Sequence, residues 1–137
     1  MHWNTALGVL PFAISLRAGI PVYEQVVYAV RRAVVTGQLR AGDPFPSVRV
    51  MSQALKINPN TAHRIVAELV AEGTLTVRPG IGTIVGEARE GGDRARRALL
   101  EDDAEHLVIE ARRAGLSLPD VLAAVRRHWA RTIRRVG

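Results

Sequence analysis

The segment from Asn58 to Leu69 carries polar side chains of the kinds that bind nucleic acid. Its apolar residues recur at helical spacing and predict a helix buried on one face: Ala62, Ile65, Val66 and Leu69. On that helix Asn60 and Arg64 point away from the buried face. Thr61 and His63 lie at its flanks. Arg can donate two hydrogen bonds to guanine, Asn can pair similarly with adenine, and Thr or the helix N-terminus can bind a phosphate. The residue types and their spacing therefore favour a helix that enters the major groove of DNA.

The same helix also has a purely structural interpretation, which the residues alone leave open. Asn58 and Thr61 would then only cap the helix, and Arg64 would be a solvated charge. His63 has an ordinary pKa close to neutrality and could make binding pH-sensitive. A simple polar contact or a solvated ring is the plainer interpretation of His63.

A second group of polar residues has a spacing that fits metal ligands. Asp102, His106 and Glu110 recur at every fourth position and would share one face of a helix. They lie opposite Leu107 and Ala111, with no second set of ligands nearby, so a solvated charged face is favoured. The chain has no Cys, and its four His residues form no nucleophile–base pattern. We expect no catalytic residues, no metal site and no cofactor, and therefore a protein that is not an enzyme.

The charge of the chain favours a polyanionic partner. Its 137 residues include 19 basic and 13 acidic side chains, which give a net charge of +6. Nucleic acid and an anionic membrane surface would both attract this charge. The apolar stretch 5–16 contains Pro11 and is shorter than the roughly 20 residues that span a bilayer, so no membrane segment is expected. The absence of Cys agrees with a cytoplasmic protein.

Three helices are expected in the first half of the chain. The first follows Pro21 and ends at Gly37. Its apolar repeat at helical spacing consists of Tyr23, Val26, Val27, Val30 and Val34. The second begins after Ser47, which stands where an N-cap belongs. The third begins with Asn58 as a further N-cap, and Gly73 ends it.

Short β-prone segments surround these helices. Residues 10–16 alternate weakly and predict a short edge strand. After the third helix, 75–78 and 83–85 flank the Pro/Gly turn 79–82 and predict a hairpin. Three helices followed by a hairpin is the order of a winged helix, so the sequence predicts a winged helix-turn-helix domain over 10–86.

Four stretches of the chain resemble the GntR family of bacterial transcription regulators, in particular its short YtrA-like branch, in their residues, their order and their spacing. They are PVYEQV at 21–26, TGQLRAGDPFPSVR at 36–49, NPNTAHR at 58–64 and GIGTIV at 80–85. The resemblance implies a DNA-binding helix-turn-helix whose recognition helix starts at Asn58, with the hairpin as its wing. Double-stranded operator DNA is then the expected partner.

The resemblance also implies which residues contact DNA. In such proteins the Arg of the PSxR motif, here Arg49, makes a contact, and the wing tip around Gly80 approaches the minor groove. With the recognition helix, the candidate residues are Ser47, Arg49, Asn58, Asn60, Thr61, His63, Arg64, Arg78, Gly80 and Gly82. A surface ion pair is the alternative role of Arg49. Three positions depart from the family pattern: Val50 replaces a frequent Glu, Pro79 a frequent basic or His residue, and Ile84 a usual Phe.

The last third of the chain predicts two amphipathic helices after a linker over 86–93. The first ends at Gly115 and the second begins at Ser117. Their apolar faces carry Leu100, Leu107, Val108, Leu118, Val121, Leu122, Val125 and Trp129. Two helices of this size cannot bury these faces alone. The resemblance implies a dimerisation tail over 94–135, anchored by Trp129; the alternative is that the pair folds back onto the winged helix.

These observations predict a fold that is mainly α with a small β-hairpin, an N-terminal winged helix-turn-helix plus a C-terminal two-helix tail. The expected function is that of a homodimeric repressor bound to a near-palindromic operator. The alternative is a ligand-responsive switch, in which an unidentified small-molecule effector or a metal binds at the tail.

Overall fold

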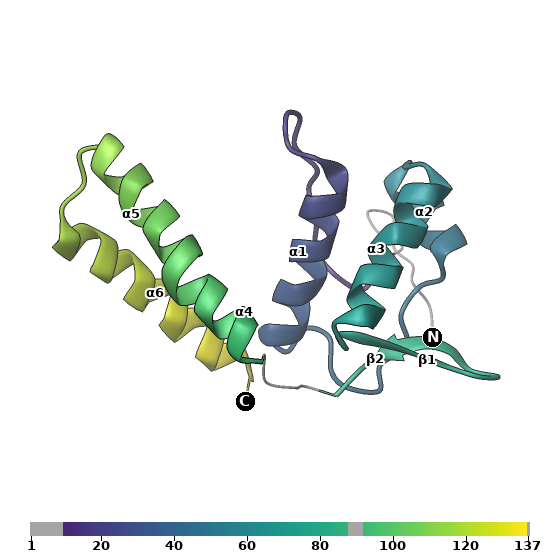
Figure 1. Ribbon diagram of the computed structural model, residues 1–137. Coiled ribbons are helices and arrows are strands. Elements are labelled where there is room, and N and C mark those ends of the chain that lie inside the picture. The colour runs from purple at the N-terminus through teal and green to yellow at the C-terminus, as the bar shows by residue number, and fades with distance from the viewer. Residues whose placement is uncertain (1–9, 88–91, 137) are drawn as a thin grey trace. The chain divides into compact units, whose positions relative to one another are not determined.

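The computed structural model describes residues 10–87 and 92–136, with side chains in the second range placed as far as Thr132. These residues form two compact units, one holding α1 to β2 and the other α4 to α6. Helices predominate in both, and the sheet found in the described residues has two strands (Figure 1). The predicted fold class, mainly α with a small β-hairpin, is confirmed.

The first unit consists of helices followed by an antiparallel hairpin. Its elements are α1 (Val22–Val35), α2 (Val48–Leu55), α3 (Pro59–Ala71), β1 (Leu75–Arg78) and β2 (Gly82–Val85). Helix α3 is central, because it packs against α1, α2 and β1 (Figure 1). This is the order of a winged helix, and β2 begins one residue earlier than the sequence predicts.

The core of this unit is built from the apolar faces of its helices and hairpin. Its fully buried side chains include Val26, Val30, Met51, Ile65, Leu69 and Leu75. Each lies in a segment that the sequence predicts as a helix or strand. Val66, which the sequence places on the buried face of α3, is only half buried. Helix α3 is therefore held along one face by Ala62, Ile65 and Leu69, and its opposite face is left to solvent.

Residues 10–16 do not form the predicted edge strand. The edge of β2 is occupied instead by the segment before α2: Phe45 N donates to Thr83 O at 2.9 Å, and Val85 N donates to Asp43 O at 2.8 Å. The N-terminal segment contributes a side chain to the core, since Phe12 is buried and stacks on Phe45 with ring centroids 5.8 Å apart. The weak alternation of 10–16 thus reflects this packing and no strand pairing. Residues 5–9 of the same apolar stretch lie outside the described residues.

The turn of the hairpin follows from its Pro and Gly. Ile81 N donates to Arg78 O at 3.0 Å, and the backbone of Gly80 has a φ of 78°. Pro at the second position of a turn and a positive φ at the third define a type II turn. A side chain other than Gly would be strained at residue 80, so the wing tip depends on this glycine.

The predicted linker 86–93 begins too early. Gly86 belongs to the first unit, because it is buried and its N–H donates to Thr74 O at 2.8 Å. A Cβ at this position would lie 2.4 Å from Gly73 O, so the chain needs a glycine to pack here. Residues 88–91 of the predicted linker lie outside the described residues.

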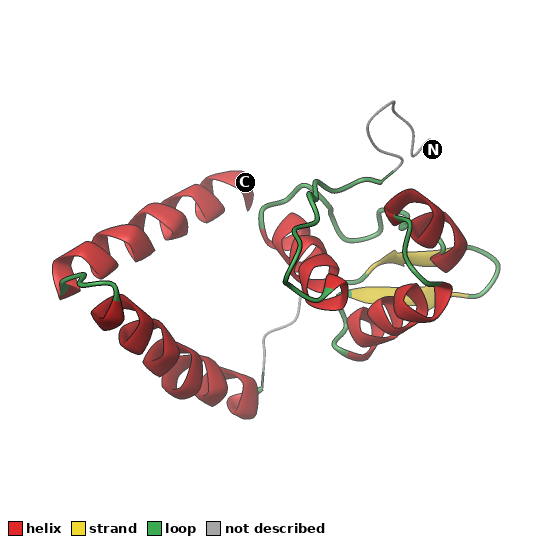
Figure 2. Ribbon diagram, turned by 90° about the horizontal axis from the view of Figure 1, so that it is seen from above, coloured by secondary structure: helices red, strands yellow, loops and turns green. Residues whose placement is uncertain are grey.

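The second unit is a pair of helices joined by a short loop (Figure 2). Its first helix runs without interruption through α4 (Asp93–Arg97), the π-helical η1 (Ala98–Asp103) and α5 (Ala104–Arg113). The sequence did not predict the π-helical stretch. Gly115, with a φ of 78°, ends this helix as expected, and α6 (Leu118–Val136) follows.

Helix α6 starts with a reciprocal cap. Asp120 N donates to Ser117 Oγ at 3.3 Å, and Ser117 N donates to Asp120 Oδ2 at 2.9 Å. The hydrogen bond that the Ser117 backbone N–H donates to the carboxylate, together with the Ser117 side chain, lowers the pKa of the Asp120 carboxyl. Among the described helices, none is long and apolar enough to cross a membrane.

Candidate nucleic-acid interface

The N-terminus of α3 is fixed by Asn58 and Pro59. Asn58 Oδ1 accepts a hydrogen bond of 2.7 Å from Asn60 N, and Pro59 occupies the first turn. The predicted capping role of Asn58 is confirmed, and its side-chain oxygen is engaged in that role. The backbone N–H groups of the first turn, together with the helix dipole, give this end of α3 a positive potential that favours a phosphate.

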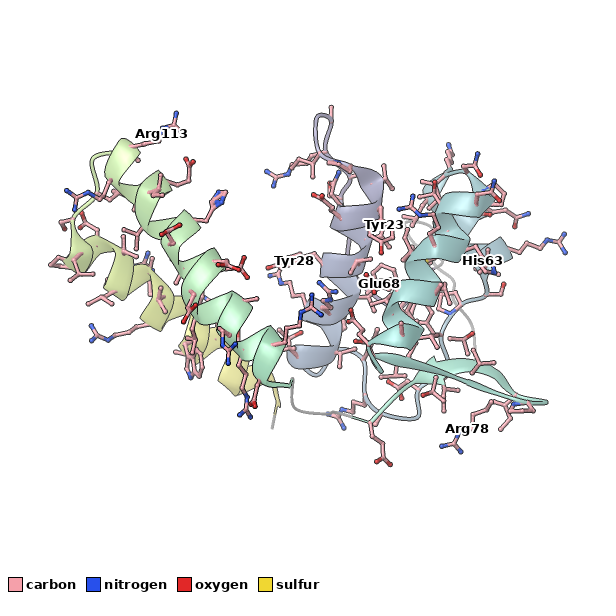
Figure 3. All side chains as sticks on the ribbon, in the orientation of Figure 1. Tyr23, Tyr28, His63, Glu68, Arg78 and Arg113 are labelled. Carbon is pink, nitrogen blue, oxygen red and sulfur yellow. The ribbon has the colours of Figure 1, made fainter. Side chains whose placement is uncertain are left out.

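The face of α3 that is turned away from the core carries the predicted polar residues. Asn60, His63 and Arg64 are exposed and Thr61 is half buried, whereas Ala62 and Ile65 between them are completely buried. Figure 3 shows His63 on the outer side of α3. The helix thus combines a rigidly packed face with a polar face that is open to solvent.

Arg64 has a partner that the helical wheel does not reveal. Its Cζ lies 4.8 Å from the ring centroid of Tyr23 on α1. The Tyr23 hydroxyl in turn donates to Glu68 Oε1 at 3.2 Å (Figure 3). Partial desolvation and the Glu68 carboxylate raise the pKa of Tyr23. Sequence reasoning placed Tyr23 in the apolar repeat of the first helix and missed this contact, because it joins helices that are distant along the chain.

Helix α2 presents Arg49 in its first turn. Ser47 Oγ accepts from Val50 N at 3.1 Å, which confirms Ser47 as the N-cap. Arg49 is exposed, and within residues 10–87 and 92–132 it forms no ion pair, so the alternative role gains no support. The turn into α3 runs through Lys56 in the left-handed conformation, with a φ of 56°. Because α2 packs on α3, Arg49 and the polar face of α3 belong to the same packed pair of helices.

The wing exposes both polar and apolar groups. Arg78, Gly80 and Gly82 are exposed, as the sequence predicts for a wing tip. Ile81 is 71% exposed and Val77 59% exposed, two apolar side chains that the sequence-based site did not include. Strand alternation would have put Val77 on the same face as the buried Leu75, and Ile81 lies in the turn before β2, so no local signal indicated their exposure.

The charges of the first unit are unevenly paired. Residues 21–86 contain seven basic and four acidic side chains, a net charge of +3. One acidic group is neutralised inside the unit, because Glu72 Oε2 accepts from Arg31 Nε at 3.0 Å. Four of the cations are exposed on α2, α3, their connection and the hairpin: Arg49, Lys56, Arg64 and Arg78. This excess of positive charge suits a polyanion.

The second unit carries the other candidate groups. Asp102, His106 and Glu110 are exposed, and Glu110 Oε2 accepts from Arg113 Nη1 at 3.0 Å. Across the part of the chain that the structure describes, no group of three or more His, Asp or Glu side chains could hold a metal ion.

The predicted tail contacts are largely left exposed by the helix pair itself. Leu100 is 73% and Trp129 68% exposed, and Val121 is half buried. The remaining predicted residues are also exposed: Leu107, Val108, Leu118, Leu122 and Val125. Among the described residues of this unit, Ala111 alone is buried, so the helix pair leaves a large apolar area uncovered.

Comparison with known proteins places these features in a wider group. The family of bacterial regulatory proteins named gntR matches residues 22–85. The HTH-type transcriptional repressor YtrA of Bacillus subtilis is 30% identical over 106 residues, which cover 77% of this chain and 82% of that protein. The uncharacterized HTH-type transcriptional regulator YhcF of the same organism is 31% identical over 106 residues, covering 77% and 88% of the two chains.

A solved structure supports the same grouping. The GntR family transcriptional regulator from Listeria monocytogenes is 26% identical and superposes with a TM-score of 0.60. The match covers 82% of this chain and 98% of that one, so it extends beyond the residues that the family pattern covers.

Proposed function

Because the chain belongs to the gntR family of bacterial regulatory proteins and is a DNA-binding transcriptional regulator, we propose that it acts as a homodimeric repressor of a near-palindromic operator. The relative YtrA, which the chain matches over most of both lengths, is named a repressor. Two-fold symmetry would set two α3 helices in successive major grooves about one helical turn apart.

The recognition surface in this proposal is the polar face of α3. Asn60, His63 and Arg64 are exposed on a helix whose opposite face is completely buried, and this observation carries the assignment. Thr61 and the capped N-terminus with Asn58 would bind phosphate, because the first N–H groups of a helix attract anions.

Two further elements complete the surface. Helix α2 would bring Arg49 to a groove edge, and its capped first turn at Ser47 would face the backbone. The wing would approach the minor groove with Arg78, and Gly80 and Gly82 would permit close contact of its backbone.

Dimerisation through the α5–α6 tail is the proposed role of the second unit. The exposed apolar side chains there, with Trp129 the largest, form a surface that a second copy could cover. The domain limits in this proposal are 10–86 for DNA binding and 94–135 for dimerisation. Among the described residues, no group of metal-ligating side chains supports the ligand-responsive alternative.

In vitro selection of duplexes from a random library, followed by gel shifts, tests the DNA contacts. We expect Arg49→Ala to weaken binding of the selected duplex by about 1–3 kcal/mol and to relax its sequence preference, as the loss of a base contact does. Arg112→Ala, which removes an exposed cation from α5, is the matched control and should leave binding unchanged. Equal affinities of the Arg49 variant and the wild type would contradict the proposed contact.

A further inference from the structure

The side of α3 that faces α1 carries a line of polar contacts. Arg64 lies over Tyr23, Glu68 accepts from the Tyr23 hydroxyl, and Glu72 pairs with Arg31. Arg64 and Glu68 of α3 and its C-cap Glu72 are spaced by four, so they follow one another along one side of the helix. Of these three residues, Arg64 alone lies in the N-terminal half of α3, which is proposed to meet DNA.

The stacking leaves the hydrogen-bonding groups of Arg64 available. A guanidinium that lies over an aromatic ring, within about 6 Å of the ring centroid, is attracted to the face of that ring. Its N–H groups point outward in the plane, where they can donate two parallel bonds to guanine or phosphate. Arg64 is exposed in the structure, so Tyr23 restrains the side chain without covering it.

Tyr23 is itself held in place from two sides. Its ring packs against the hydrophobic core, and its hydroxyl donates to Glu68 at 3.2 Å. Tyr28, on the same helix, is 64% exposed and stands outside this arrangement. The ring of Tyr23 therefore offers Arg64 a fixed support that belongs to the scaffold.

We propose that Tyr23 is a positioning residue for DNA recognition: its ring holds the Arg64 guanidinium at the edge of the polar face of α3 that lies next to α1, ready to donate to a base edge or a phosphate. This rests on the proposed function. A restrained Arg loses less rotamer freedom when it binds, so the effect of Tyr23 on affinity acts through Arg64.

A double-mutant cycle on the full-length chain tests the proposal. The probe is the duplex that wild-type protein selects from a random library, and the variants are Tyr23→Leu, Arg64→Ala and their combination. Tyr23→Leu should weaken binding by about 2- to 30-fold, the range expected for loss of a cation–π contact. In the Arg64→Ala background the same substitution should change affinity little. Tyr23→Phe keeps the ring and should retain most of the binding, and Tyr28→Leu is the control on the same helix.

The outcomes separate the two proposals. If Tyr23→Leu weakens binding equally with and without Arg64, Tyr23 acts independently of Arg64 and the positioning role is overturned, while DNA recognition stands. If Tyr23→Phe binds as weakly as Tyr23→Leu, the ring is not the support and the proposal is also overturned. If the wild-type chain selects no duplex, sequence-specific operator binding fails and the positioning role fails with it. Unfolding midpoints of all variants, measured in urea, distinguish a loss of contact from a loss of fold.

Discussion

At the scale of single residues, some polar side chains of the candidate interface cap its helices and others are exposed on its surface. The side-chain oxygens of Asn58 and Ser47 accept the hydrogen bonds that cap their helices. Arg49, Asn60 and His63 are exposed. Their sequence-based assignment to DNA stays a prediction, and the caps explain why the exposed groups stand on well-defined helix starts.

Gly86 offers a sharp test of packing at this scale. Gly86→Ala should destabilise the first unit by about 1–3 kcal/mol, because the new Cβ would meet Gly73 O at 2.4 Å and the backbone must shift. Denaturant unfolding followed by circular dichroism measures the loss. Gly92→Ala is the matched control, since a Cβ there has no atom within 4 Å. Equal destabilisation of both variants would show that the contact at Gly86 is easily relieved.

At the scale of elements, α3 is the part that joins fold and function. It packs on α1, α2 and β1, so any face it presents is oriented by three neighbours. The ion pair between Arg31 of α1 and Glu72 at the end of α3 adds a polar contact to this packing. Arg31 lowers the pKa of Glu72 more than burial raises it, and Thr74 contributes a further hydrogen bond.

This ion pair predicts a pH dependence of stability. Because the pKa of Glu72 is lower in the folded chain than its ordinary value of 4.5, its stabilisation is complete above that value and is lost as the pH falls through the lowered pKa. We expect Glu72→Gln to cost up to about 1 kcal/mol near pH 7, since the pair is partly exposed. The difference from wild type should shrink below pH 4.5. Unfolding free energies measured from pH 7 to pH 3 check this, and a difference independent of pH would contradict it.

At the scale of the whole molecule, the second unit by itself leaves its apolar surface uncovered. Ten of its large apolar side chains are exposed, from Leu99 to Trp129. An exposed apolar surface of this kind marks a site where a partner binds. A second copy of the chain, related by two-fold symmetry, could cover it. The proposed dimer would also bring two recognition helices to one operator.

Trp129→Ala tests this assembly. We expect the substitution to weaken dimerisation by about 2 kcal/mol or more, because a large aromatic anchor is removed from the interface. Sedimentation equilibrium measures the change, and the affinity for a two-half-site duplex should fall with it. Tyr28→Ala is the matched control, since Tyr28 is an aromatic of similar exposure on α1, 64% against 68%. A Trp129 variant that remains as dimeric as the wild type would remove Trp129 from the interface.

Much of the fold could be predicted because its signals are local. Caps at Ser47 and Asn58, helix ends at Gly37 and Gly73, and the Pro/Gly turn of the hairpin each act over a few neighbouring residues. The strand over 10–16 was wrong because pairing depends on which segment reaches the edge of β2, and residues 42–45 reach it. Residue 86 was predicted both as the end of the domain and as the start of the linker, and its packing against Gly73, a contact in space, assigns it to the first unit.

The sequence by itself determined the order of the elements, the apolar face that docks α3 and the family to which the chain belongs. Each of these depends on periodicity, capping or motif spacing, which are properties of short stretches. The tertiary structure decided that Arg64 lies over Tyr23, that Phe12 stacks on Phe45 and that Glu72 meets Arg31. Such contacts join residues that are far apart along the chain, and only the packing of helices against one another brings them together.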